Sequence, residues 1–488
     1  MNFVFSFGQP LLPAGAVSGE LRCHLQGGAL MAGIGFELKK LLRKGTLSSM
    51  LHTYALSAAL SSGPWVISMI VIMLVGFVSF SISAETMEST EFQSIVTYVL
   101  MLASSLIFSS FFQLPFTRFV ADRIFEKKEH LVLPNFFGLL IVLFGAGFVI
   151  ILPFSLWLFE HQSNFFILLF ITTFLVLNGV WISNILATSL RFFRITILAY
   201  LISYSLIFLL SLFLKSGGKE GMLIAFLIGN LLLLIMLVMA IIYHYPSHHL
   251  VRFDFFDKKR FYYRLGITGL FYNLAIWIDK IIFWYSPVTG NVVLDNLHAS
   301  IVYDMPIFLA YLAIIPGMAI FFYRLEADFS ENYDRYYDAV RGEGTLARIR
   351  QERYDMIGTI RIALREILII QGIFNLILLM VSEPLFAMLR IPQLYLGLFY
   401  IDLLGTQLQL AFMSVLAILF YLDRQREAMV LSILFFVFNA LFSWISIALG
   451  PYFFGYGFAV AVLTVFVIAV LWLRYVMQRL EYETYMLQ

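Results

Sequence analysis

Residues 264–286 read RLGITGLFYNLAIWIDKIIFWYS, and this stretch decides what kind of protein the chain can be. It is long and apolar enough to cross a bilayer as a helix, yet Asp279 and Lys280 stand side by side within it. At about 1.5 Å per residue, Asp279 lies roughly 22 Å along the helix from Arg264, inside a hydrocarbon layer of about 30 Å. A charge at that depth costs on the order of 2.5–3.5 kcal/mol, so it usually faces a partner or a hydrated cavity.

The two charges do not have the spacing of a local pair, because adjacent residues on a helix point about 100° apart. We therefore expect at least one of them to meet a group on another helix or in a cavity. For Lys280 the alternative is that its ammonium reaches the nearer membrane surface. Gly266, Gly269 and Asn273 soften the same helix and suit a segment that bends. We interpret the helix as lining a transport pathway, with Asn273, Asp279 and Lys280 as candidate residues.

The composition indicates an integral membrane protein. The chain has 488 residues, of which 61% are hydrophobic and 13% are charged, whereas soluble domains carry about 25% charged residues. Its net charge of +2 does not indicate nucleic acid, and we expect no such partner. The single cysteine, Cys23, excludes an internal disulfide and a thiolate metal cluster.

Twelve hydrophobic spans are predicted along the chain. Most of the 32 Lys and Arg residues fall in alternate connecting loops, which by the positive-inside rule predicts that both termini are cytoplasmic. The expected spans are 48–81, 92–117, 132–159, 163–190, 195–214, 221–245, 264–286, 300–324, 358–381, 395–421, 427–449 and 454–476.

The spans suggest two bundles of six helices. We expect 1–30 to be an unstructured extension, 31–245 to form the first bundle with an amphipathic start, and 246–263 to be a cytoplasmic linker. The second bundle is then 264–488, with a cytoplasmic insert at 325–357. In this frame a predicted kink in the first span corresponds to the stretch at 264–286, and interrupted helices at matching places point to a substrate pathway. The residues of this kink join the pathway candidates: Ser61, Ser62, Gly63 and Pro64.

The loops carry no pattern typical of enzyme chemistry. The run KSGGK at 215–219 lacks the earlier glycine and the following Ser or Thr of a phosphate-binding loop. His248 and His249 are adjacent and do not have a metal-ligand spacing. We therefore expect no catalytic residues, no metal and no cofactor.

The insert at 325–357 carries aromatic residues at helical spacing with charged residues between them. Such a helix either docks a protein partner or lies on the lipid surface. The residues we expect to dock a partner are Phe329, Tyr333, Tyr336 and Tyr337.

Three short stretches carry a resemblance: MAGIGFEL at 31–38, SSGPW at 61–65 and YHYP at 243–246. With these, the chain from Met31 onward resembles the Pel exopolysaccharide transporter family of the bacterial inner membrane. That family belongs to the multidrug/oligosaccharidyl-lipid/polysaccharide superfamily of flippases and antiporters. The resemblance implies export of a biofilm polysaccharide beside a cytoplasmic glycosyltransferase and a cyclic-di-GMP-binding membrane protein. No functional residues follow from it.

The sequence thus predicts an all-α polytopic membrane protein with twelve transmembrane helices in two six-helix bundles, like a flippase or antiporter. Its expected function is non-enzymatic: it moves nascent polysaccharide from cytoplasm to periplasm for a biofilm matrix. One alternative is an ion-coupled carrier of drugs or lipid-linked oligosaccharides, with Asp279 as the coupling carboxylate. Another is a membrane scaffold that anchors a polysaccharide synthase and transports nothing. A multispan glycosyltransferase is disfavoured, because no convincing carboxylate pair is present.

Overall fold

The computed structural model describes residues 90–189, 193–257, 261–342, 344–389 and 391–486, with a few isolated residues between 57 and 75. These residues form helices and one two-stranded hairpin. They divide into two compact units. The first holds the described residues up to Asp304 together with 432–440, and the second holds 305–431 and the described residues after 440.

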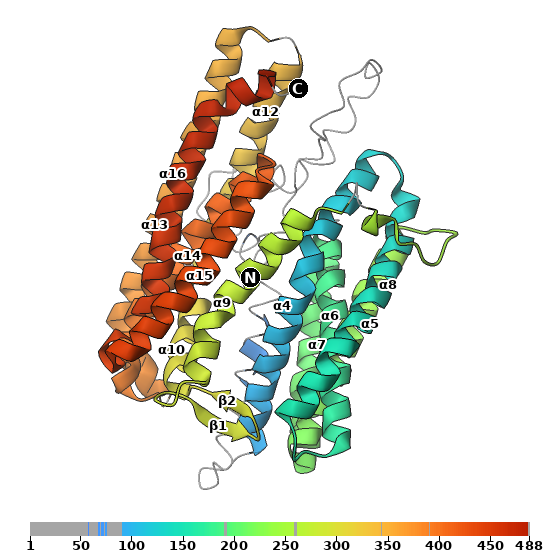
Figure 1. Cartoon of the computed structure of the whole chain (residues 1–488), viewed down its shortest axis with the longest axis vertical. Helices are drawn as coiled ribbons and strands as arrows, with labels where there is room; N and C mark the ends of the chain where they lie inside the picture. The colour runs from blue at the N-terminus through green and yellow to red at the C-terminus, as the bar shows by residue number, and fades with distance from the viewer. Residues whose placement is uncertain are drawn as a thin grey trace. The chain divides into compact units, whose positions relative to one another are not determined.

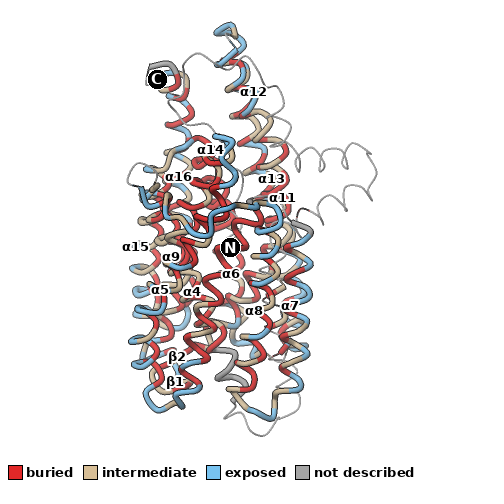
Figure 2. Tube along the Cα trace, turned by 90° about the vertical axis from the view of Figure 1, so that its right-hand side faces the viewer, coloured by how far each residue is buried: buried red, intermediate tan, exposed pale blue. Residues whose placement is uncertain are grey.

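The described residues of the first unit include six long helices (Figure 1). α6 packs against α4, α5 and α8, while α9 packs along α4. Apolar exposed residues run along α5 and α7, as expected of helices that face lipid (Figure 2). The helices are α4 (Thr90–Phe125), α5 (Val132–Leu158), α6 (Asn164–Ser189), α7 (Phe193–Phe213), α8 (Gly218–His244) and α9 (Tyr263–Trp284), with short 3-10 turns η2 (Glu129–Leu131), η3 (Leu214–Gly217) and η4 (Asp254–Phe256).

Two glycines let α9 approach α4 closely. A Cβ atom at Gly266 would lie 2.8 Å from the carbonyl oxygen of Phe111, and one at Gly269 would lie 2.5 Å from that of Ser110. Small residues permit such close contact of helix backbones in membranes. The two glycines therefore serve packing in a continuous helix, and the expectation that this helix bends stays a prediction.

A β-hairpin follows α9 and was not predicted. Strands β1 (Asn291–Leu294) and β2 (Leu297–Ala299) pair antiparallel. At the turn, Asn296 bonds to the end of α5, through its backbone N–H to Leu158 O at 3.2 Å and its Nδ2 to Trp157 O at 2.8 Å. Leu294 and Leu297 join the apolar core of the first unit, so the hairpin covers one end of that unit.

The second unit is also helical. α14 packs against α16, and α13 packs against α11, α12 and α14. Its elements are α10 (Ile301–Leu312), whose first residues lie in the first unit, α11 (Ile315–Tyr323), a π-helical segment η5 (Arg324–Phe329), α12 (Ser330–Arg341), α13 (Leu346–Met388), η6 (Gln393–Tyr395), α14 (Leu396–Tyr421), α15 (Gln425–Leu449), whose residues 432–440 lie in the first unit, η7 (Pro451–Phe453) and α16 (Tyr456–Met486).

The insert predicted at 325–357 is a continuation of two spans. α13 has 43 residues, which at about 1.5 Å each gives a length of roughly 65 Å, twice the hydrocarbon thickness of about 30 Å. α11, η5 and α12 run on without a break from Ile315 to Arg341 and then turn into α13. The insert is therefore a helical hairpin built on spans that extend beyond the bilayer.

The chain is a multi-pass membrane protein. Nine helices in the described ranges are long and apolar enough to cross a membrane, or ten if the bent pair α10–α11 forms one span; α7 and α8 count as one here. Each predicted span from 92–117 onward coincides with a helix or, for 300–324, with this pair. Residues 1–30 and most of the first span lie outside the described residues. The linker predicted at 246–263 lies within the first unit, and the residue bounds predicted for the two bundles stay a prediction.

Candidate transport pathway

Asp279 and Lys280 form a direct ion pair inside the first unit. Asp279 is fully buried and Lys280 is 6% exposed. Lys280 Nζ lies 3.2 and 3.1 Å from the two carboxylate oxygens of Asp279, and it also donates to Ile276 O at 2.8 Å. The expectation that these neighbours do not meet is wrong, because the long lysine stem folds back along the helix. The alternative that Lys280 reaches the membrane surface is wrong as well.

A second helix completes the environment of this pair. The hydroxyl of Tyr303, on α10, donates to Asp279 Oδ2 at 2.7 Å, and the Tyr303 ring stacks on Phe283 with centroids 3.8 Å apart. Lys280 Nζ also lies 5.9 Å from the centroid of the Trp277 ring, within reach of a cation–π contact. The pair is thus neutral as a whole and has partners on both helices.

Another carboxylate lies where α10 begins. Trp284 Nε1 donates to both oxygens of Asp304, at 2.9 and 2.8 Å, and the Ser300 N–H donates to Oδ2 at 3.2 Å. We did not single out Asp304 or Tyr303 in the sequence. The signal for Asp304 is its place in the first turn of a helix, where an acidic residue meets unpaired N–H groups. Because α9 ends at Trp284, Asp279 is only about 8 Å from the end of the helix, not at mid-span.

Asn273 carries an unused acceptor in the same helix. Its Nδ2 donates to Gly269 O at 3.0 Å, while its buried Oδ1 has no hydrogen-bond partner among the described residues. The remaining pathway candidates, Ser61, Ser62, Gly63 and Pro64, lie outside the described residues. The prediction that they share a pathway with α9 stays a prediction.

The second unit has its own polar centre, at the break between α10 and α11. The two helices meet at an angle of 41°. Gln371 on α13 donates from Nε2 to Ala313 O at 2.9 Å and accepts from the Gly317 N–H at 3.0 Å. A broken helix leaves such carbonyl and N–H groups without partners. One side chain therefore serves both sides of the break.

Other amides extend this network. Gln371 Nε2 donates to Asn375 Oδ1 at 2.8 Å, Asn375 Nδ2 to Gln407 Oε1 at 2.9 Å, and Gln407 Nε2 to Leu368 O at 2.8 Å. Since these amides bond to one another and to backbone, they hold α11, α13 and α14 together.

The aromatic residues predicted to dock a partner pack within the second unit. Phe329, Tyr333 and Tyr336 are buried and Tyr337 is half-buried. The Tyr421 ring, from α14, lies 5.3 Å from Phe329 and 5.9 Å from Tyr333. The prediction that these residues are exposed anchors for a partner is therefore wrong. They attach η5 and α12 to α14. That this helix docks a partner stays a prediction.

The comparisons with solved structures define the class of the fold. A multidrug resistance MATE family transporter of the MOP superfamily, in an outward-facing conformation, is 13% identical, with TM-score 0.56 over 87% of this chain and 96% of that chain. A MOP superfamily transporter from Pyrococcus furiosus is 12% identical, with TM-score 0.60 over 94% of this chain and 99% of that chain. The fold is therefore that of the MOP-superfamily transporters.

The family follows from the sequence model. The PelG model, exopolysaccharide exporter (EPS-E), matches residues 31–485, and the chain belongs to this family. No curated protein matches the chain. The predicted resemblance and the predicted class, an all-α flippase or antiporter with twelve helices in two bundles, are confirmed. Both the family and the fold are those of transporters rather than enzymes.

Proposed function

We propose that this chain moves nascent Pel-type exopolysaccharide from the cytoplasm to the periplasm across a bacterial inner membrane, for a biofilm matrix. The observation that carries the proposal is the family match over 31–485 on a transporter fold. The basic loops support an orientation with both termini in the cytoplasm.

The polymer would be supplied by partners. The sequence carries no convincing carboxylate pair for glycosyl transfer, so a separate enzyme would build the chain that is exported. We propose that this enzyme is a cytoplasmic glycosyltransferase and that a cyclic-di-GMP-binding membrane protein accompanies it. The helical hairpin of α12 and α13 is the surface we propose for their contact.

For the pathway we propose Asn273, Asp279 and Lys280, with Ser61 to Pro64 of the first span. The buried ion pair and the unused Asn273 Oδ1 support this, since hydroxyl-rich substrates need donors and acceptors inside the membrane. The alternative in which Asp279 binds a coupling ion by itself is disfavoured, because Lys280 already neutralises the carboxylate at 3.1 Å.

Reconstitution tests the proposal. The chain and its synthase partners are placed in vesicles with the cytoplasmic face outward, the sugar nucleotide is added outside, and polymer protected from added glycosidase is measured. Accumulation inside, lost when this chain is omitted, supports export. Equal accumulation without the chain would favour the scaffold. Transport that stops when proton and sodium gradients are collapsed would favour the ion-coupled carrier.

A further inference from the structure

An open polar pocket lies on the second unit, between the π-helical segment, α12 and α13. Its volume is about 190 Å³. Pockets that enclose drug-sized ligands are larger, about 300–1,000 Å³, so this one fits a small charged group and not a length of sugar chain. The lining residues are Arg324, Asp328, Glu331, Asn332, Arg335, Thr359 and Ile362.

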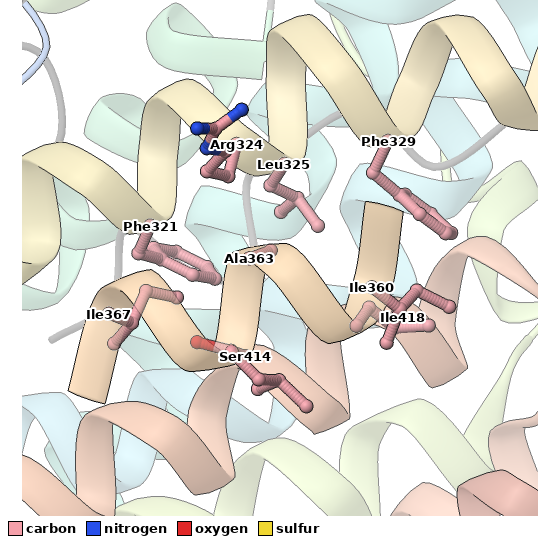
Figure 3. A pocket seen from close by; sticks show the side chains of 10 residues that line it. Phe321, Arg324, Leu325, Phe329, Ile360, Ala363, Ile367, Ser414 and Ile418 are labelled. Atoms are coloured by element: carbon pink, nitrogen blue, oxygen red, sulfur yellow. The ribbon is translucent and has the colours of Figure 1, made fainter. Parts of the chain in front are cut away.

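The helix that forms one wall has two opposite sides. Phe321, Leu325 and Phe329 pack toward Ile360 and other apolar residues of α13 and α14, whereas the Arg324 guanidinium points away from them (Figure 3). Residues 324–329 form a π-helix, a rare conformation often found at functional sites. The apolar side of this helix packs against α13 and α14 and holds the helix in place, while its polar side lines the pocket.

The charges of the pocket are arranged asymmetrically. Arg324 donates to the two carboxylate oxygens of Glu366, at 2.6 Å each, and also bonds to Asp328. Arg335 bonds to Glu331 near the mouth, where these side chains are 57% and 41% exposed. The lining thus carries two carboxylates and two guanidinium groups, and Glu366, which binds Arg324, does not line the pocket. Arg335 is the more exposed of the two arginines.

The pocket lies at the level where two spans leave the membrane. The apolar run of α11 ends at Tyr323, and on α13 the charged residues give way to an apolar stretch after Glu366. An exposed apolar stripe on α13 begins at the pocket and leads away from it through the span. Its residues are Ile362, Ile369, Ile373, Leu376 and Met380.

We propose that this pocket binds the headgroup of a phospholipid that carries a primary ammonium and a phosphate, such as phosphatidylethanolamine. The ammonium donates hydrogen bonds to Glu331 and Asp328, and the phosphate meets the exposed Arg335 guanidinium, whose planar donors suit it. The acyl chains then follow the stripe on α13. A choline headgroup lacks N–H donors and a glycerol headgroup lacks a cation. Neither can therefore both donate hydrogen bonds to the carboxylates and place a phosphate on Arg335.

Lipid selection on the purified full chain tests the proposal. The chain is reconstituted into vesicles of equal parts phosphatidylethanolamine, phosphatidylcholine and phosphatidylglycerol, then re-extracted in mild detergent, and the retained lipids are quantified by mass spectrometry. We expect about tenfold enrichment of phosphatidylethanolamine, as one charge-assisted contact provides. E331Q and R335Q should each abolish the enrichment. R361Q is the matched control, an exposed arginine beside Ile362 that does not line the pocket, and should keep it.

A second measurement needs no variant. Replacing phosphatidylethanolamine by its mono- and dimethylated forms removes N–H donors one at a time and should lower retention stepwise. Equal retention of the three lipids, a preference for phosphatidylglycerol, or the same loss in R361Q as in R335Q would overturn the proposal. Retention that is indifferent to methylation would overturn the role of the carboxylates.

Discussion

Removing either member of the Asp279–Lys280 pair should harm the protein more than removing both. In K280M the buried Asp279 carboxylate loses the ammonium and keeps the Tyr303 hydroxyl, and in D279N the buried ammonium loses its carboxylate and keeps Ile276 O. Breaking a buried pair by removing one partner costs about 3–5 kcal/mol, whereas replacing both by uncharged groups is often neutral. We expect each single variant to lose about that much and D279N/K280M to lose less than either.

A double-mutant cycle on the purified chain measures this coupling, through the free energy of unfolding in detergent followed by tryptophan fluorescence. The matched control is the cycle on Lys128 and Glu126, an exposed pair with a similar distance of 3.0 Å, for which about 0.2–1 kcal/mol is expected. Losses at 279 and 280 that simply add, or a coupling no larger than in the control, would refute the reasoning.

The same cycle separates folding from transport. The single variants should have low abundance in membranes, so their lost export does not identify a pathway. The double variant should return to near-normal abundance. If it still exports no polymer, the pair serves transport; if export returns with abundance, the pair is structural and the pathway lies elsewhere.

Three further outcomes are expected. Q371L should lower the free energy of unfolding by about 2–4 kcal/mol, because it leaves two backbone groups unpaired at the break between α10 and α11, whereas Q351L on the exposed part of α13 should change it little. Y333S should lower the free energy of unfolding by about 2–5 kcal/mol and lower the abundance of the protein, so loss of the glycosyltransferase from these membranes would not report docking. D338K lies on the exposed face of α12 and should release the enzyme at normal protein abundance if that face docks it. A chain that starts at Met31 should keep both membrane abundance and polymer output, and a large loss of either would contradict the prediction that the preceding residues are dispensable.

The sequence predicts the helices well because their signal is local. A span must be apolar over about 20 residues, and its ends are marked by charged loops, so hydropathy alone locates each described span. The hairpin at 291–299 was not predicted, because strands of four and three residues are too short to show an alternating apolar pattern. Its stability comes from contacts with the distant end of α5 and with the core of the first unit.

Helical spacing located the aromatic stripe of α12 correctly but could not say what covers it. The pattern of Phe329, Tyr333 and Tyr336 suits a protein partner, a lipid surface or another helix of the same chain equally well. The structure supplies the last of these, through Tyr421 on α14. In a membrane protein an amphipathic face therefore predicts burial, and long-range packing alone decides against which surface.

At the break between α10 and α11, the sequence predicts the break itself but not how its backbone groups are hydrogen-bonded. Pro316 lacks an N–H group and disfavours a continuous helix, and Gly317 follows it, so a break near this point is readable from the sequence. The hydrogen bonds from Gln371 that satisfy the broken helix cannot be predicted from the sequence, because Gln371 lies 54 residues after Gly317. Gln371 reaches the break only because Gly317 has no side chain: a Cβ there would lie 2.4 Å from Leu410 Cδ2 and 2.6 Å from Gln371 Oε1. The glycine that weakens the helix thus also admits the amide that restores its hydrogen bonds, and the two residues are expected to tolerate substitution only together.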